Sequence, residues 1–100
     1  FCNIGRNVMI QGGSRFSQDI PPYIIAGKEP IRYAGINIIG LRRRGFTNEQ
    51  IDHIHNAYRI LYGEGTREEN IQKIIETLEI TEEIQHIIDF VKASKRGIIK

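Results

Sequence analysis

The sequence predicts a β+α chain, with a parallel β-solenoid segment in residues 1–34 and a helical domain in residues 35–100. Two observations lead to this prediction. At the start of the chain, apolar residues recur every six positions between glycine-containing turns, as in repetitive β structures. After residue 36, the apolar spacing becomes that of amphipathic helices, and threonine-led capping sequences mark helix starts. About four helices are expected there.

The sextet residues of the first segment are Ile4, Ile10 and Phe16. Each is expected to place its side chain inward from a short strand, while the intervening glycines supply turns. A single solenoid coil cannot bury its apolar face alone. Because only about one coil is visible and Phe1 is not an initiator methionine, we expect further coils upstream. Two ordinary strands with glycine turns remain an alternative for this segment.

Pro21-Pro22 ends the sextet pattern, because two prolines remove two backbone donors and fix an extended path. Tyr23–Ala26 is predicted to leave the solenoid as a strand or loop, and Gly27–Pro30 to form a turn before the helical part. Gln18 and Asp19 are expected to close the solenoid rather than to contact a substrate.

Three longer helices are predicted in the second part of the chain. The first starts at a capping box led by Thr47 and runs to about Tyr62. The second starts at a capping box led by Thr66, and the third is capped by Thr81 and ends at Gly97. The apolar stripes that should face the core are Ile51, Ile54, Tyr58, Leu61 and Tyr62, then Ile71, Ile74, Ile75 and Leu78, then Ile84, Ile87, Ile88 and Val91.

A short helix carrying three arginines is predicted from Asn37 to Arg44, with Asn37 as its N-cap and Gly45 as its stop. Guanidinium groups bind phosphate or carboxylate through paired hydrogen bonds, so Arg42–Arg44 suggest an anion site. Asn37 and Arg44 lie near one helix face, and Gly40 between them is expected to leave room for a ligand. The alternative is a basic helix end that stays solvated and satisfies the helix dipole.

The charge distribution also points to an anionic partner. Residues 1–46 carry seven Lys/Arg against two Asp/Glu, whereas residues 47–100 carry seven against ten, within a net charge of +2. Helices on either side of Gly45 resemble a helix-turn-helix, but the second of them carries Glu49 and Asp52 against a single Arg59. The acidic helical part therefore argues against nucleic acid as the partner.

Other chemistry finds little support in the sequence. His53 and His55 are two positions apart on a helix and cannot share a metal, and His86 stands alone, so no metal site is predicted. No nucleophile elbow or cofactor motif is visible, so no catalytic residue and no cofactor are assigned to this chain. The single cysteine, Cys2, fits a reducing compartment, and no apolar run approaches the roughly 20 residues of a membrane span.

Several blocks of the chain resemble the C-terminal part of the UDP-N-acetylglucosamine O-acyltransferases. These blocks are Ile4-Gly5 with Val8, then Gly12–Ala26, Gly35–Phe46, Asn56–Tyr62 and the closing Ser94–Lys100. The resemblance implies an N-terminal left-handed parallel β-helix of hexapeptide repeats, of which this chain holds the last coil, and a C-terminal helical domain. It also implies a cytoplasmic homotrimer that carries out the first step of lipid A biosynthesis.

In that family a 3-hydroxyacyl chain moves from acyl carrier protein to the 3-hydroxyl of UDP-N-acetylglucosamine. The family's general-base histidine belongs to coils upstream of Phe1, so this chain alone is expected to be inactive. The nucleotide-contacting positions fall on Asn37, Arg43 and Arg44. Gly12 falls where side-chain size sets the length of the acyl groove, and a glycine implies a longer chain. Ile39 stands where the family often has Glu.

The same resemblance suggests where acyl carrier protein meets the chain. Arg6, Arg15, Arg32 and Arg42 are candidates for a positive surface opposite this acidic partner. Two other functions stay open: a related hexapeptide-repeat enzyme, the UDP-3-O-acylglucosamine N-acyltransferase, and a small helix-turn-helix DNA-binding module.

Overall fold

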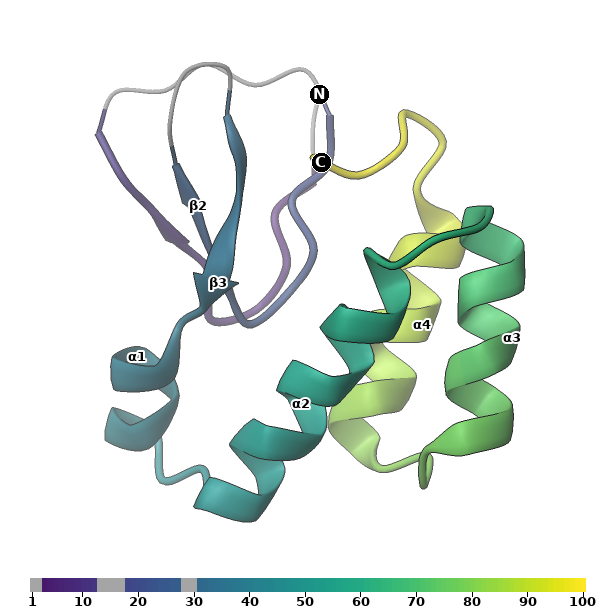
Figure 1. The fold of residues 1–100 in the computed structure, drawn as a ribbon. Helices are drawn as coiled ribbons and strands as arrows, with labels where there is room; N and C mark the ends of the chain where they lie inside the picture. Colours follow the sequence, from purple (N-terminus) through teal and green to yellow (C-terminus); the bar gives the residue numbers. More distant parts are fainter. Residues whose placement is uncertain (1–2, 13–17, 28–30) are drawn as a thin grey trace.

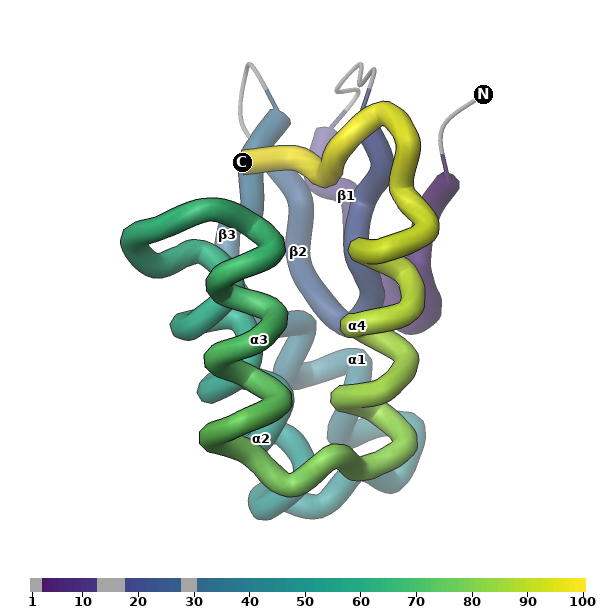
Figure 2. The backbone as a smooth tube through the Cα atoms, turned by 90° about the vertical axis from the view of Figure 1, so that its right-hand side faces the viewer, coloured from purple at the N-terminus to yellow at the C-terminus, as the bar shows by residue number. Residues whose placement is uncertain are grey.

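A computed structural model of the chain describes residues 3–12, 18–27 and 31–100. It shows a small sheet beside four helices (Figure 1). The elements are β1 (Met9–Ile10), β2 (Ile24–Gly27), β3 (Arg32–Ile36), α1 (Ile38–Arg43), α2 (Asn48–Leu61), α3 (Arg67–Thr77) and α4 (Glu82–Ala93). Seen from the side, α3 and α4 lie nearest the viewer and the sheet lies behind them (Figure 2). The four predicted helices are therefore confirmed.

In the β part, two successive segments of the chain lie side by side and pair in parallel. Ile4 bridges Ile20, and β1 pairs with β2 with Ile10 opposite Ala26, so that paired residues are 16 positions apart. This offset is not a multiple of six, so the sextet spacing does not set the register. Phe16, the third sextet residue, lies outside the described residues.

Close backbone contact joins the two stacked segments. The Gly5 N–H donates to the Ile20 carbonyl at 2.8 Å, and a Cβ on Gly5 would lie 2.4 Å from the Pro22 nitrogen. Ile20 is fully buried, but Ile4 is 50% exposed. The inward direction expected for Ile4 stays a prediction, because no described residue lies on the side where an upstream coil is expected.

The sheet also contains a strand that the sequence did not predict. The segment before the arginine run forms β3, which pairs antiparallel with β2. Ile24 and Ala26 of β2 face the core and are fully buried, as expected for a strand that leaves the repetitive segment. The proposed turn at 27–30 lies mostly outside the described residues.

The helix starts follow the predicted caps. Thr47 and Thr66 both form complete capping boxes, and the Thr81 hydroxyl accepts the Ile84 N–H. The predicted stripes of α2 and α4 are buried except for Tyr62, which follows α2 and is half-buried. Ile71 and Ile74 of α3 join the core, and Leu78 packs against it half-buried. Ile75 is an exception at 39% exposed, because α3 packs through a narrower face than its sequence suggested.

The end of α4 differs from the prediction. The helix ends at Ala93 with Ser94 as C-cap, not at Gly97. Gly97 instead has a φ of +83° and turns the chain into a buried tail, in which Ile98 bridges Asp19 in parallel. Ile98 and Ile99 are 5% and 1% exposed. The tail thus adds to the edge of the β part, which the sequence did not reveal.

Asp19 ties this tail to the first segment and is only 2% exposed. Its carboxylate accepts the Asn3 N–H at 2.7 Å and the Ser94 hydroxyl at 2.6 Å, and its backbone bonds to Gly97 and Ile99. Burial pushes the pKa of Asp19 up, but these hydrogen bonds and the nearby Arg96 outweigh burial and leave the pKa below its ordinary value. The structural role predicted for Asp19 agrees with these contacts.

Three tyrosines pack together between the sheet and the helices. Tyr58 is fully buried and its hydroxyl donates to the Pro22 carbonyl at 2.6 Å. Tyr33 lies nearly parallel to Tyr58 and Tyr62, at centroid distances of 5.6 and 4.8 Å. Burial raises the pKa of all three phenols, so they stay neutral donors near neutral pH.

Candidate functional site

Asn37 begins α1 and is the best-anchored residue of the predicted site. Its Oδ1 accepts the Gly40 N–H at 3.2 Å, its Nδ2 donates to the Asn7 carbonyl at 2.9 Å, and its own N–H donates to the Tyr23 carbonyl at 2.9 Å. The residue is 7% exposed. The amide therefore holds α1 onto the β part, and one Nδ2 hydrogen and one lone pair of Oδ1 remain for any ligand.

The two backbone positions that Asn37 contacts are unusual. Asn7 and Tyr23 both have positive φ, at 56° and 71°, and the Tyr23 N–H donates to the Arg6 carbonyl at 2.7 Å. Left-handed backbone is uncommon for a bulky residue such as tyrosine and needs support from its surroundings. Phe46 and His86 supply it by packing against the Tyr23 ring at centroid distances of 5.9 and 6.0 Å. No sequence pattern indicates this conformation of Tyr23.

The space beside Gly40 is occupied by the Asn37 side chain and not left open for a ligand. A Cβ on Gly40 would lie 2.4 Å from Asn37 Nδ2 and 2.8 Å from its Oδ1. The expectation that this glycine leaves room for a ligand is therefore wrong, because the Asn37 amide already fills the space.

We expect Gly40→Ala to destabilise the protein by about 1–3 kcal/mol, the usual range for overpacking. In an unhindered helix the same change would stabilise by about 1 kcal/mol, so the sign of the effect is informative. Thermal unfolding of Gly40→Ala, Asn37→Ala and the double variant measures it. The double variant should be no less stable than Asn37→Ala, because the clashing amide is gone. If the stability losses of Gly40→Ala and Asn37→Ala instead add in the double variant, then the alanine methyl group and the Asn37 amide do not compete for the same space.

The three arginines occupy the end of α1. Arg42 and Arg43 are in its last turn and Arg44 is its C-cap, while Leu41 between them is fully buried and anchors the helix. All three arginines are exposed. Arg42 donates to Asn48 Oδ1 at 3.4 Å. The guanidinium groups of Arg43 and Arg44 have no hydrogen bond or ion pair with any described residue, so they are available to an anion.

The surface beside Arg43 is apolar. Ile39 lies one turn before Arg43 on the same helix face and is 66% exposed, and its neighbour Ile38 is 41% exposed. Ile38 also borders a cleft of about 360 Å³ between β3 and α2, where Asp52 and His55 are the polar lining residues. An anion held by Arg43 would therefore meet an aliphatic side chain next to its charged group.

Gly12 lies far from the arginines in the described chain. It follows β1, which is parallel to β2, whereas α1 follows β3, which is antiparallel to β2. Gly12 and α1 therefore lie beyond opposite ends of the sheet. Gly12 has a φ of +68°, and a Cβ there would have no neighbour within 4 Å. Within one copy of the chain, Asn37, Arg43 and Arg44 belong to α1 and its two caps, and Gly12 lies apart from them.

The histidines lie in three separate places. His53 Nε2 is 2.7 Å from the Glu79 carbonyl oxygen, and His55 is exposed. The buried Nε2 of His86 has no hydrogen-bond partner among the described residues, and burial followed by the charge of Arg6 lowers the pKa of His86. In the described ranges, no three His, Cys, Asp or Glu side chains gather as metal ligands would. The helices described there are also too short or too polar to cross a bilayer.

Comparison with known proteins gives consistent results. Residues 19–99 match the family model described as UDP N-acetylglucosamine O-acyltransferase, domain 2. An acyl-[acyl-carrier-protein]–UDP-N-acetylglucosamine O-acyltransferase from Paraburkholderia phymatum is 39% identical over the whole chain. The chain spans 40% of the length of that relative.

Solved structures agree with this match. The crystal structure of a UDP-N-acetylglucosamine acyltransferase from Bacteroides fragilis superposes with a TM-score of 0.96 at 59% identity. A homologue from Acinetobacter baumannii superposes with a TM-score of 0.91 at 34% identity. In both cases the alignment covers all of this chain and 40% of the other.

Proposed function

Because this chain belongs to the UDP-N-acetylglucosamine O-acyltransferase family, we propose that the full-length protein transfers a 3-hydroxyacyl chain from acyl carrier protein to the 3-hydroxyl of UDP-N-acetylglucosamine. This would be the first step of lipid A biosynthesis, in the cytoplasm. The family match over residues 19–99 is the observation that carries the proposal. The related N-acyltransferase and a DNA-binding module are not favoured by it.

In this proposal the chain supplies part of the nucleotide site and not the base. Arg43 and Arg44 bind the diphosphate with charge-assisted hydrogen bonds, supported by the absence of described partners for either side chain. Asn37 presents its remaining polar atoms to the nucleotide. Its hydrogen bonds also hold the start of α1, the helix that carries the arginines, against the β part. Ile39 offers an aliphatic contact where a relative with Glu would offer a polar one.

The reaction itself needs groups outside this chain. The sugar hydroxyl attacks the thioester carbonyl, a base takes its proton, and the carrier thiol leaves as the new ester forms. We assign the base to a histidine upstream of Phe1, and no described histidine of this chain to that role. Gly12 belongs to the acyl groove and admits a longer acyl chain.

We further propose that residues 1–34 end a left-handed parallel β-helix and that residues 35–100 form the helical domain. The parallel bridges 16 residues apart and the exposed Ile4 and Met9 support this, because a further coil would cover those side chains. The boundary falls inside β3, which joins the two parts. In a homotrimer, Gly12 of one copy and the arginines of another would contribute to the same groove.

The test is an acyl-transfer assay with two proteins. We expect the full-length protein to acylate UDP-N-acetylglucosamine from 3-hydroxyacyl carrier protein, and residues 1–100 alone to show no transfer. UDP-3-O-acylglucosamine, offered as the competing acceptor, should remain unacylated. Transfer to that acceptor but not to UDP-N-acetylglucosamine would disprove the proposed substrate, and transfer by residues 1–100 would disprove the upstream base.

A further inference from the structure

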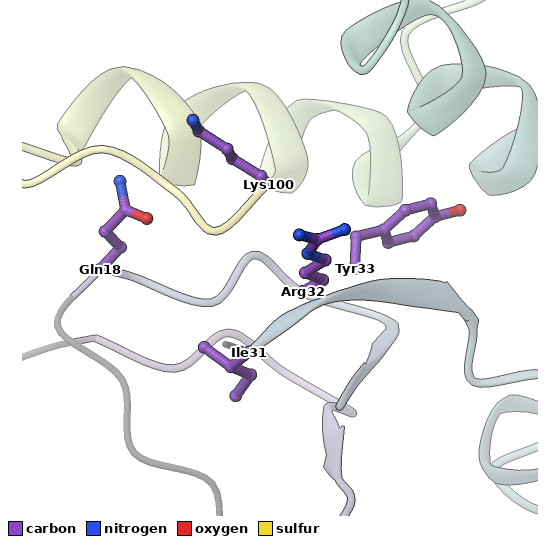
Figure 3. Close-up of a pocket in the computed structure, with 5 residues that line it drawn as sticks. All are labelled: Gln18, Ile31, Arg32, Tyr33 and Lys100. Carbon is purple, nitrogen blue, oxygen red and sulfur yellow. The ribbon is translucent and has the colours of Figure 1, made fainter. Parts of the chain in front are cut away.

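A second polar cleft lies at the end of the sheet away from α1. It has a volume of about 620 Å³ and is lined by Gln18, Ile31, Arg32, Tyr33 and Lys100 (Figure 3). Arg32 and Tyr33 begin β3, whereas α1 follows its other end. The cleft is therefore distinct from the arginine pair at which the nucleotide site is proposed.

Backbone hydrogen bonds bring these distant parts of the chain together. The Tyr33 N–H donates to the Lys100 carbonyl at 2.6 Å, which places Lys100 beside the start of β3. The Ile99 N–H donates to the Asp19 carbonyl at 3.0 Å, which places the same tail beside Gln18. The Tyr62 hydroxyl adds a bond of 2.6 Å to the Ile99 carbonyl. The positions of Gln18, Arg32 and Lys100 are thus set by the fold.

The described lining residues carry only positive side-chain charges. Arg32 and Lys100 are both cationic, and the described lining contains no Asp or Glu. No hydrogen bond or ion pair to another described residue engages the side-chain groups of Gln18, Arg32 or Lys100. In Figure 3 the Lys100 side chain extends away from Arg32 toward the side of the cleft where the Gln18 amide lies, and the Arg32 guanidinium lies on the other side. Two cations that line one cleft favour an anion between them.

The positive surface continues across Lys100. Lys100 also borders a neighbouring cleft of about 440 Å³, where Arg67 is the other charged lining residue and Tyr62 forms one wall. A Cβ on Gly97 would lie 3.4 Å from an Arg67 guanidinium nitrogen and 3.5 Å from Gln18 Nε2, so these side chains approach the same turn. Arg32, Lys100 and Arg67 therefore form a row of cations along two adjoining clefts.

The cleft also offers apolar contact. Ile31 and the half-buried ring of Tyr33 lie beside the cations, and burial raises the pKa of Tyr33, so the ring stays uncharged near neutral pH. A volume of this size suits a small organic molecule. A guanidinium, an ammonium and an amide together match the several oxygens of a phosphate group.

We propose that this cleft, called here the tail cleft, binds a phosphate monoester with an apolar or aromatic body. Arg32 and Lys100 hold the phosphate, Gln18 donates to one of its oxygens, and Ile31 and Tyr33 contact the body. The site does not depend on the proposed acyltransferase activity. A ligand bound there would also hold the C-terminal tail against β3, because Lys100 belongs to the tail and Arg32 to the strand.

The test is calorimetric titration of the full-length protein with phenyl phosphate, inorganic phosphate and phenol, with saturating UDP present to occupy the nucleotide site. We expect phenyl phosphate to bind more tightly than inorganic phosphate, and phenol not to bind. Arg32→Gln and Lys100→Gln should each weaken phenyl phosphate binding about tenfold, since each removes one charge-assisted contact. Lys92→Gln, which removes an exposed cation from α4, is the matched control and should bind normally.

Each other outcome contradicts the proposal. Equal affinity in all variants, equal loss in Lys92→Gln, or no binding of phenyl phosphate at millimolar concentration would each exclude a site at the tail cleft. Because Arg32 and Lys100 are exposed, their replacement should leave the unliganded melting temperature unchanged. Arg43→Ala/Arg44→Ala should keep full phenyl phosphate affinity, and a loss there would place the anion at α1 instead.

Discussion

Arg43→Ala and Arg44→Ala are each expected to lower kcat/KM for UDP-N-acetylglucosamine by roughly 10- to 150-fold in the full-length enzyme. In the proposed nucleotide site, each substitution removes one charge-assisted hydrogen bond to a phosphate, a contact that contributes about 1.5–3 kcal/mol. The effect should be mainly in KM, because the diphosphate is bound equally in the ground state and in the transition state. Steady-state kinetics with the sugar nucleotide as the varied substrate measure it.

Arg42→Ala is the matched control for this experiment. Arg42 belongs to the same arginine run, but its guanidinium already contacts Asn48 Oδ1. Its replacement should leave KM for the sugar nucleotide within about twofold of the parent value, since exposed side chains of this kind contribute little. Unchanged kinetics in both Arg43→Ala and Arg44→Ala would remove the arginine pair from the nucleotide site. Equal losses in all three variants would indicate a general charge effect instead.

Helix starts were predictable from sequence because they depend on local chemistry. Asn37, Thr47, Thr66 and Thr81 each bond to a backbone N–H within three residues, so a short sequence window contains the whole interaction. The buried stripes of α2 and α4 follow from helical periodicity for the same reason.

Contacts between distant segments were not predictable in this way. The role of Gly40 depends on where the Asn37 amide lies, and that position depends on the carbonyl of Asn7, 30 residues away. The short strand β3 has no marked alternation of its own and exists because β2 and Lys100 pair with its backbone. The prediction that Asn37 and the arginines share one short helix is therefore confirmed, and the expectation of free space at Gly40 is wrong.

The tail was missed because its partner is 79 residues away in sequence. Ile98 and Ile99 follow a glycine and form too short a segment to show a period, so nothing local marks them as part of the β structure. The burial of Asp19 was likewise not indicated by the sequence, because an aspartate before Pro21-Pro22 is typical of an exposed turn. Its burial and its contacts with Asn3 and Ser94 became evident only in three dimensions.

Asp19→Ala is expected to release this tail and to lower the free energy of its local unfolding by about 3 kcal/mol. The substitution leaves the Asn3 N–H and the Ser94 hydroxyl without their charged acceptor, and each such bond contributes about 1.5–3 kcal/mol. Hydrogen exchange of the Ile99 and Tyr33 amides in the full-length protein measures the change, since both amides donate across the tail. Exchange should be roughly 100-fold faster.

The pH dependence and a milder variant make this prediction specific to the carboxylate. Because the folded protein holds the pKa of Asp19 below its unfolded value, the carboxylate stabilises the tail above that unfolded value, and this stabilisation is lost as the pH falls through the folded pKa. Asp19→Ala should abolish this acid dependence at the Ile99 amide. Ser94→Ala removes one bond and should retain most of the protection. If Asp19→Ala exchanges at the parent rate, then the buried β contacts of Ile98 hold the tail without the carboxylate.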